Sequence, residues 1–160
     1  MRIISGEFKG KILISPDNNE IRPTSDRGKE VIFDTLSSIL YKQDKEYKEI
    51  NILDIFCGSG SLGIEAISRG GKNLFVIDNS EKAINLTKMN CEKLNIKNVN
   101  LLNYNFFDIN LSLIKQADVI FLDPPYKSYE PSESSGYLYF FKVHLPLATT
   151  CLQTYRLFSN

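Results

Sequence analysis

The chain has 160 residues, 42% of them hydrophobic and 24% charged, which excludes an intrinsically disordered segment and fits one globular domain. Nineteen basic and nineteen acidic side chains cancel, so any contact with RNA or DNA must come from a local patch. Three cysteines without a close CxxC pair argue against a disulfide framework and a zinc site, and favour a reducing cytosol. No run approaches the roughly 18 apolar residues of a membrane span, and the N-terminus lacks a signal-peptide core. We therefore expect a cytoplasmic protein that uses neither a membrane nor a metal.

The first 48 residues predict an N-terminal arm and one helix. Residues 3–14, with two glycines, indicate a small β-hairpin or extended arm. Val31, Ile32, Leu36 and Leu40 favour a helix that starts between residues 24 and 26. We divide the chain into this arm and helix (residues 1–48), a core (49–127) and a tail (128–160).

From residue 51 onward, strands alternate with helices, as expected for a Rossmann-like α/β fold with a parallel sheet. The predicted strands are short apolar runs at residues 52–56, 74–77, 99–102 and 119–122. Glycines at 70 and 71 should end a helix that begins near Ser61. Ser80 is a plausible N-cap for the next helix, which has apolar residues on one face. We expect the strand order 3-2-1-4.

A glycine-rich loop, Asp54-Ile-Phe-Cys-Gly-Ser-Gly-Ser-Leu-Gly63, connects the first strand to the first core helix. Its GxGxxG pattern also occurs in dinucleotide-binding dehydrogenases. An acidic Asp54 would repel a pyrophosphate, but it suits a cofactor with an amino-acid moiety, such as S-adenosylmethionine. Asp78 ends the second strand, where a carboxylate can accept both ribose hydroxyls; this placement is shared by NAD and S-adenosylmethionine sites.

Two further loops should lie at the same edge of the sheet. After the third strand, Asn105 is our first choice and Asp108 our second for the contact with an adenine amine. After the fourth strand, residues 123–126 read Asp-Pro-Pro-Tyr. The prolines restrict the backbone, so Asp123 and nearby carbonyls can accept hydrogen bonds from an exocyclic amine while Tyr126 stacks on the base. Such a site would align the amine with a methyl donor.

The chain resembles the bacterial RsmD family over roughly residues 1–127. The resemblance rests on the opening residues 1–11, the Ile-Arg-Pro-Thr-Ser-Asp-Arg segment at 21–27, the glycine-rich loop and Asp-Pro-Pro-Tyr. It implies methylation of the N2 amine of a guanine in 16S ribosomal RNA, with S-adenosylmethionine as cofactor and the small ribosomal subunit as partner. The family usually has Asp where Asn105 stands.

The predicted site residues fall into three groups. The catalytic set is Asp123, Pro124, Pro125 and Tyr126. The cofactor set is Asp54, Phe56, Gly58, Gly60, Asp78, Asn79, Asn105 and Phe106. The RNA-binding set is a small basic patch of Arg2, Lys9, Lys11, Arg22 and Arg27. We expect a monomer.

The tail after Lys127 does not match the family, and we interpret it as a truncated or frame-shifted end that reduces activity. It predicts a strand at residues 137–143 and a short helix, with an exposed edge on the fourth strand. Two alternatives stay open. One is a methyltransferase for the N6 amine of DNA adenine, although the chain has no room for a large target-recognition region. The other is a non-catalytic remnant that binds cofactor or RNA.

Overall fold

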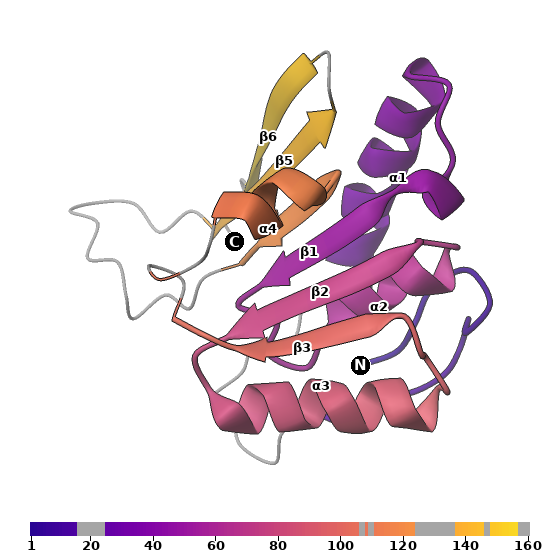
Figure 1. The fold of residues 1–160 in the computed structure, drawn as a ribbon. Coiled ribbons are helices and arrows are strands. Elements are labelled where there is room, and N and C mark those ends of the chain that lie inside the picture. The colour runs from indigo at the N-terminus through magenta and orange to yellow at the C-terminus, as the bar shows by residue number, and fades with distance from the viewer. Residues whose placement is uncertain (16–24, 106–107, 109–110, 124–136, 146–147, 157–160) are drawn as a thin grey trace.

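The computed structural model describes residues 1–15, 25–105, 108, 111–123, 137–145 and 148–156. Its centre is a six-stranded sheet in the order β3-β2-β1-β4-β5-β6 (Figure 1). The first four strands are parallel and match the predicted strands and their order 3-2-1-4: β1 (Asn51–Ile55), β2 (Asn73–Asp78), β3 (Val99–Asn103) and β4 (Val119–Leu122). All four therefore end at the same edge of the sheet.

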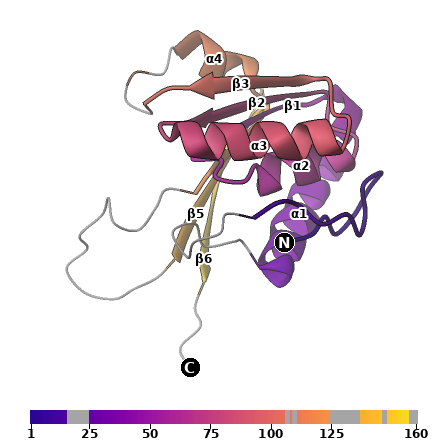
Figure 2. The same cartoon turned by 90° about the horizontal axis from the view of Figure 1, so that it is seen from below.

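Helices cover both faces of the parallel strands. Figure 2 shows α1 (Asp26–Lys42), α2 (Ser61–Ser68) and α3 (Glu81–Lys93) on one side of the sheet and α4 (Leu111–Gln116) on the other. A short 3-10 helix, η1 (Tyr47–Glu49), precedes β1. The predicted N-cap of α3 is confirmed, because the Ser80 side chain accepts a hydrogen bond from the backbone nitrogen of Ala83.

The predicted N-terminal arm is a short antiparallel pairing. Arg2 and Ile12 form a β-bridge, and the nitrogen of Ile3 donates to the carbonyl of Lys11 at 2.9 Å. The turn between them needs Gly6 and Gly10, whose φ angles are +81° and +82°. The side chains of Ile3 and Leu13 are buried. The arm is therefore packed on the domain.

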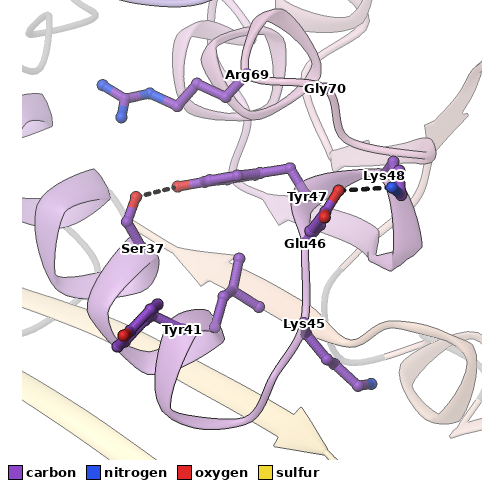
Figure 3. Close-up of a pocket in the computed structure, with 9 residues that line it drawn as sticks. Ser37, Tyr41, Lys45, Glu46, Tyr47, Lys48, Arg69 and Gly70 are labelled. Carbon is purple, nitrogen blue, oxygen red and sulfur yellow. Dashed lines mark hydrogen bonds and ion pairs between the residues drawn. The ribbon is translucent and has the colours of Figure 1, made fainter.

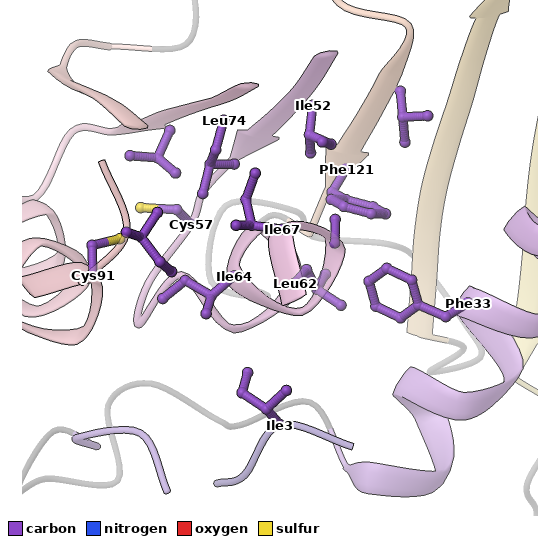
Figure 4. Packing of buried hydrophobic residues seen from close by; sticks show 14 of the residues in the cluster. Ile3, Phe33, Ile52, Cys57, Leu62, Ile64, Ile67, Leu74, Cys91 and Phe121 are labelled. Atoms are coloured by element: carbon purple, nitrogen blue, oxygen red, sulfur yellow. The ribbon is translucent and has the colours of Figure 1, made fainter. Parts of the chain in front are cut away.

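The larger part of the core lies between the sheet and helices α1, α2 and α3 (Figure 4). Phe33 of α1 meets Phe121 of β4 edge to face, with ring centroids 5.6 Å apart. The guanidinium carbon of Arg69 lies 4.6 Å from the centre of the Phe33 ring. On the opposite face, the partly buried side chains of α4 cover Leu53, Ile55 and Ile77. Both faces of the central strands are thus protected from water.

The tail differs from the sequence-based expectation. It contains two long strands, β5 (Tyr137–Leu145) and β6 (Ala148–Arg156), which form an antiparallel pair, and β5 also pairs with β4. The strand predicted at residues 137–143 is confirmed, and the prediction of an open edge on β4 is wrong, because β5 pairs with β4. Residues 137–145 and 148–156, the described part of the tail, contain no helix. The physical reason is visible in the sequence of β6, where β-branched and aromatic residues favour an extended backbone. Among the described residues, no helix is long and apolar enough to cross a membrane.

Candidate active site

The glycine-rich loop leaves β1 in a tight left-handed turn. Phe56, Gly58 and Gly60 have φ angles of +60°, +55° and +74°. The nitrogen of Phe56 still donates to the carbonyl of Ile77 at 2.9 Å, so the turn starts directly at the end of the sheet. Gly60 is the N-cap of α2. The loop therefore presents backbone groups, with few side chains, at the carboxyl edge of the strands.

Asp78 fixes this loop. Its Oδ2 accepts a hydrogen bond from the nitrogen of Gly58 at 3.1 Å, and its Oδ1 accepts one from the nitrogen of Ser80 at 2.9 Å. Its backbone carbonyl accepts from the side chain of Asn103 at 2.9 Å and from the nitrogen of Tyr104 at 3.1 Å. One residue thus joins the ends of β1, β2 and β3.

Side chains of helix α3 donate hydrogen bonds to backbone carbonyls of the glycine loop. The hydroxyl of Thr87 donates to the carbonyl of Gly58 at 3.1 Å, and the side-chain nitrogen of Asn90 donates to the carbonyl of Ser59 at 3.0 Å. A Cβ added at Gly60 would lie 2.6 Å from the Thr87 methyl group. Close packing here therefore needs a glycine, beyond the requirement for a positive φ.

Asp54 is buried beneath the loop, with 2% of its surface exposed. Its Oδ2 accepts a hydrogen bond from the nitrogen of Gly63 at 2.9 Å, so it links β1 to the first turn of α2. Burial raises the pKa of Asp54 to about 8, and the nearby carboxyls of Asp123 and Asp78 push it in the same direction. The sequence did not indicate this bond to the helix.

Asp123 follows β4, which pairs with β1 on the side opposite to β2 and Asp78. Ile55 is in register with Ile77 of β2 and with Leu122 of β4, so the next position, Phe56, is flanked by Asp78 and Asp123. Two strand spacings of about 4.8 Å put the backbones of these two residues about 10 Å apart. Burial raises the pKa of Asp123 to about 6. The expected adjacency of the cofactor loop and the end of β4 is therefore present.

The remaining predicted residues of the cofactor and catalytic sets are exposed, half-buried or outside the described part of the chain. Asn79, Asn105 and Asp108 are exposed and follow the ends of β2 and β3, and Phe56 is half-buried. The residues outside the described ranges are Phe106, Arg22, Pro124, Pro125 and Tyr126. No metal-binding group of three or more His, Cys, Asp and Glu side chains occurs among the described residues.

The described members of the basic patch, Arg2, Lys9, Lys11 and Arg27, are all exposed. Arg2 is also tied to α1, because its Nε donates to Oδ2 of Asp26 at 2.8 Å. Sequence reasoning missed the residues that hold the arm. The buried carboxylate of Glu65 accepts hydrogen bonds from the nitrogens of Ile4 and Ser5, at 2.8 and 3.0 Å.

A cavity of about 390 Å³ opens elsewhere, between α1, η1 and the end of α2 (Figure 3). It lies at the amino-terminal edge of the strands, away from the glycine loop. Its charged groups are already paired, since Lys48 contacts Glu46 at 2.7 Å and Arg69 contacts Glu65 at 3.0 Å. The hydroxyls of Tyr47 and Ser37 are 3.0 Å apart. We therefore place the candidate site at the glycine loop, where the backbone has positive φ angles and the carboxyl groups of Asp54, Asp78 and Asp123 lie.

Known proteins share both the sequence and the fold. The family model "Conserved hypothetical protein 95" matches residues 1–136. "Putative rRNA methyltransferase YlbH" of Bacillus subtilis is 36% identical over 131 residues, which are 79% of this chain and 67% of that protein. "Ribosomal RNA small subunit methyltransferase D" of Haemophilus influenzae is 33% identical over 132 residues, 79% of this chain and 64% of that protein.

A solved structure, "Putative methyltransferase yhhF from Escherichia coli", superposes with a TM-score of 0.63 at 29% identity and covers 80% of this chain and 65% of that one. The chain therefore has the Rossmann-like fold of class I methyltransferases. It spans about two thirds of the length of the curated relatives it matches, 67% and 64% for the two named above. The chain belongs to the RsmD family, whose model bears the description conserved hypothetical protein 95.

Proposed function

We propose that this protein transfers a methyl group from S-adenosylmethionine to an exocyclic amine of a ribosomal RNA base. The base would be a guanine of 16S ribosomal RNA, methylated on N2 within the small subunit. The observation that carries this proposal is the placement of Asp78 and Asp123 on either side of the loop that leaves β1. One carboxylate lies where a ribose would bind, and the other where an amine would meet the methyl donor.

The residues present fit the cofactor. Gly58 and Gly60 allow close approach of the backbone, and the Asp78 carboxylate can accept ribose hydroxyls beside the loop. Asn105 and Phe56 would contribute on the adenine side, together with Asn79. S-adenosylmethionine, when bound, supplies a methyl group on a sulfonium, and the sulfur leaves as a neutral thioether that needs no acid catalyst. Names of the relatives support RNA of the small subunit as the substrate class.

Asp123 would act on the amine. An exocyclic amine is a poor nucleophile, because its lone pair is conjugated with the ring. An ionised Asp123 would accept a hydrogen bond from one N–H of the amine, which would hold the nitrogen in line with the methyl carbon and favour localisation of the lone pair. Once the nitrogen carries the methyl group, its surplus proton would pass to the Asp123 carboxylate, which then releases it to water. Asp123 is half-buried, which limits competition from water for this hydrogen bond.

The test is transfer of a labelled methyl group to small subunits isolated from cells that lack this modification, followed by digestion to nucleosides. Label in N2-methylguanosine is the expected result. A parallel reaction with duplex DNA as the acceptor should give no label, and label in N6-methyladenine of that DNA with none in the small subunits would overturn the proposal in favour of a DNA enzyme. Binding of S-adenosylhomocysteine without any transfer would identify a non-catalytic protein.

A further inference from the structure

Three polar residues of α3 form a row at helical spacing, and each has a different set of contacts. Thr87 contacts the glycine loop, where its hydroxyl donates to the Gly58 carbonyl at 3.1 Å. Lys93, two turns on, bonds to the arm, through the Ile12 carbonyl at 2.9 Å. Asn90 lies between them on the same face and contacts both segments.

Asn90 makes three hydrogen bonds from a fully buried position. Its Nδ2 donates to the Ser59 carbonyl at 3.0 Å and to the Ile14 carbonyl at 3.1 Å. Its Oδ1 accepts from the Ile14 nitrogen at 2.7 Å. An amide is suited to this position, since it carries two donors and an acceptor without charge. Loss of the side chain would leave buried backbone groups of both segments without partners.

We propose that Asn90 is a positioning residue that couples the N-terminal arm to the cofactor loop. This inference deepens the proposed function and rests on it. Ser59 follows Gly58, whose nitrogen is held by Asp78, so a cofactor bound at Asp78 restrains the same backbone that Asn90 contacts. Restraint of Ser59 then favours the arrangement of Asn90 that holds Ile14. A bound cofactor should therefore raise the affinity of the docked arm for RNA. Because coupling between two binding sites is reciprocal, bound RNA should raise the affinity for cofactor by the same factor.

Other contacts of the arm are made elsewhere. Glu65 and Ser68 of α2 bind the arm at Ile4, Ser5 and Phe8. In the described part of the chain, hydrogen bonds connect the arm to the glycine loop through Asn90 and through Met1, whose sulfur accepts from the Ser59 hydroxyl at 3.7 Å. The sulfur contact is long and weak. Asn90 is therefore the main hydrogen-bonded link between the two segments.

The test is amide hydrogen exchange of the arm in the full chain, with and without saturating S-adenosylhomocysteine. S-adenosylhomocysteine, which S-adenosylmethionine becomes after it gives up its methyl group, should slow hydrogen exchange at the Ile14 amide by at least about fivefold. This is the lower end of the usual range of coupling between two sites. Asn90→Ser should remove this slowing. Thr87→Val and Lys93→Met are the matched controls from the same helix face, and both should retain it. Thr87→Val should weaken the binding of S-adenosylhomocysteine, and a saturating concentration of the ligand compensates for this loss of affinity.

Ile14→Pro provides a second variant in case Asn90→Ser does not fold, because it removes the bridging N–H from the arm and leaves α3 intact. This variant should reduce the slowing caused by bound S-adenosylhomocysteine without abolishing it, because the carbonyl at position 14 can still accept from Asn90; the readout is the Leu13 amide, whose nitrogen donates to the Met1 carbonyl at 2.9 Å. Slowing that persists in Asn90→Ser, slowing of the wild-type size in Ile14→Pro, or a wild-type arm whose exchange does not respond to bound S-adenosylhomocysteine overturns the inference. Equilibrium dialysis with labelled S-adenosylhomocysteine distinguishes the failure of the proposed function, since a wild-type protein that retains no label does not bind it.

Discussion

The backbone nitrogen of Gly58 donates a hydrogen bond to Oδ2 of Asp78 at 3.1 Å. This bond joins the end of β2 to the loop that leaves β1. The carboxylate therefore sets the shape of the loop and stands at the position from which it would bind a ribose. Removal of its charge should affect cofactor binding more than folding.

Asp78→Asn should weaken binding of S-adenosylhomocysteine by roughly 10- to 100-fold, because hydrogen bonds to a charged group contribute about 1.5–3 kcal/mol. Glu81→Gln is the matched control, since it removes a nearby exposed carboxylate in the first turn of α3. Isothermal titration calorimetry measures both. Equal affinity of Asp78→Asn and wild type would contradict the assignment of Asp78 to the cofactor.

Gly60→Ala should destabilise the protein more than Gly10→Ala. Both glycines have similar φ angles, +74° and +82°, so both alanines carry the strain of about 1–2 kcal/mol expected in the left-handed region. Only the new Cβ at position 60 meets a neighbour, the Thr87 methyl group at 2.6 Å, whereas position 10 has no heavy atom within 4 Å. Urea denaturation should show the difference. Similar losses for both variants would mean that the loop adjusts to the extra methyl group.

Glu65→Gln should loosen the arm. The Glu65 carboxylate accepts from two arm nitrogens and from Arg69, and it has no exposed surface. An amide nitrogen in place of one oxygen would face a donor, so we expect a loss of about 3 kcal/mol or more in the free energy of unfolding. Exposed Glu30→Gln is the control and should be nearly neutral. Unchanged exchange at the Ile4 and Ser5 amides in Glu65→Gln would show that the arm is held by other contacts.

Asp54 should make stability fall as pH rises from about 4 to about 8. Its pKa is raised from 3.8 to about 8 in the folded protein, so the folded state keeps a proton that the unfolded chain releases in this range. The free energy of unfolding then decreases with pH by up to about 1.4 kcal/mol per unit from this group.

Asp54→Asn should remove this part of the pH dependence while its oxygen still accepts from Gly63. Urea denaturation of both proteins at pH 5 and pH 7 tests it: the wild type should lose up to about 3 kcal/mol more than the variant. Parallel pH profiles would show that Asp54 is ionised in the folded protein.

The sequence predicted the parallel sheet because each feature it needs is local. Short apolar runs define the strands, and Ser80, Gly60 and Gly70 mark the helix boundaries at the loops between them. Parallel strands have their carboxyl ends at one edge of the sheet, so the placement of Asp78 and Asp123 on either side of the end of β1 followed from the strand order alone. The structure confirms these two positions at the strand ends, and the roles of both residues remain predictions.

Contacts between distant segments could not be predicted in this way. The bonds of Glu65 to Ile4 and of Asn90 to Ile14 span 61 and 76 residues. Both side chains lie on helices where a polar residue is ordinarily exposed, so no local pattern marks them as buried. The strand β6 was also missed: its β-branched and aromatic residues favour an extended backbone, but they show no clear period of apolar residues, and β6 pairs with β5 along its whole length. Tertiary context decides such segments.

The most direct measurement of the central claim is labelled-methyl transfer to unmodified small subunits by wild type, Asp123→Asn and Asp118→Asn between pH 5 and pH 8. Asp123 and Asp118 lie just after and just before β4, and Asp118 only binds the Asn51 nitrogen and Lys45. Because burial raises the pKa of Asp123 to about 6, wild-type kcat/KM should rise about tenfold per unit below that pH and level off above it. Asp123→Asn should lose at least about 100-fold, and Asp118→Asn should stay within a few-fold of wild type. Transfer by Asp123→Asn at the wild-type rate would contradict the account.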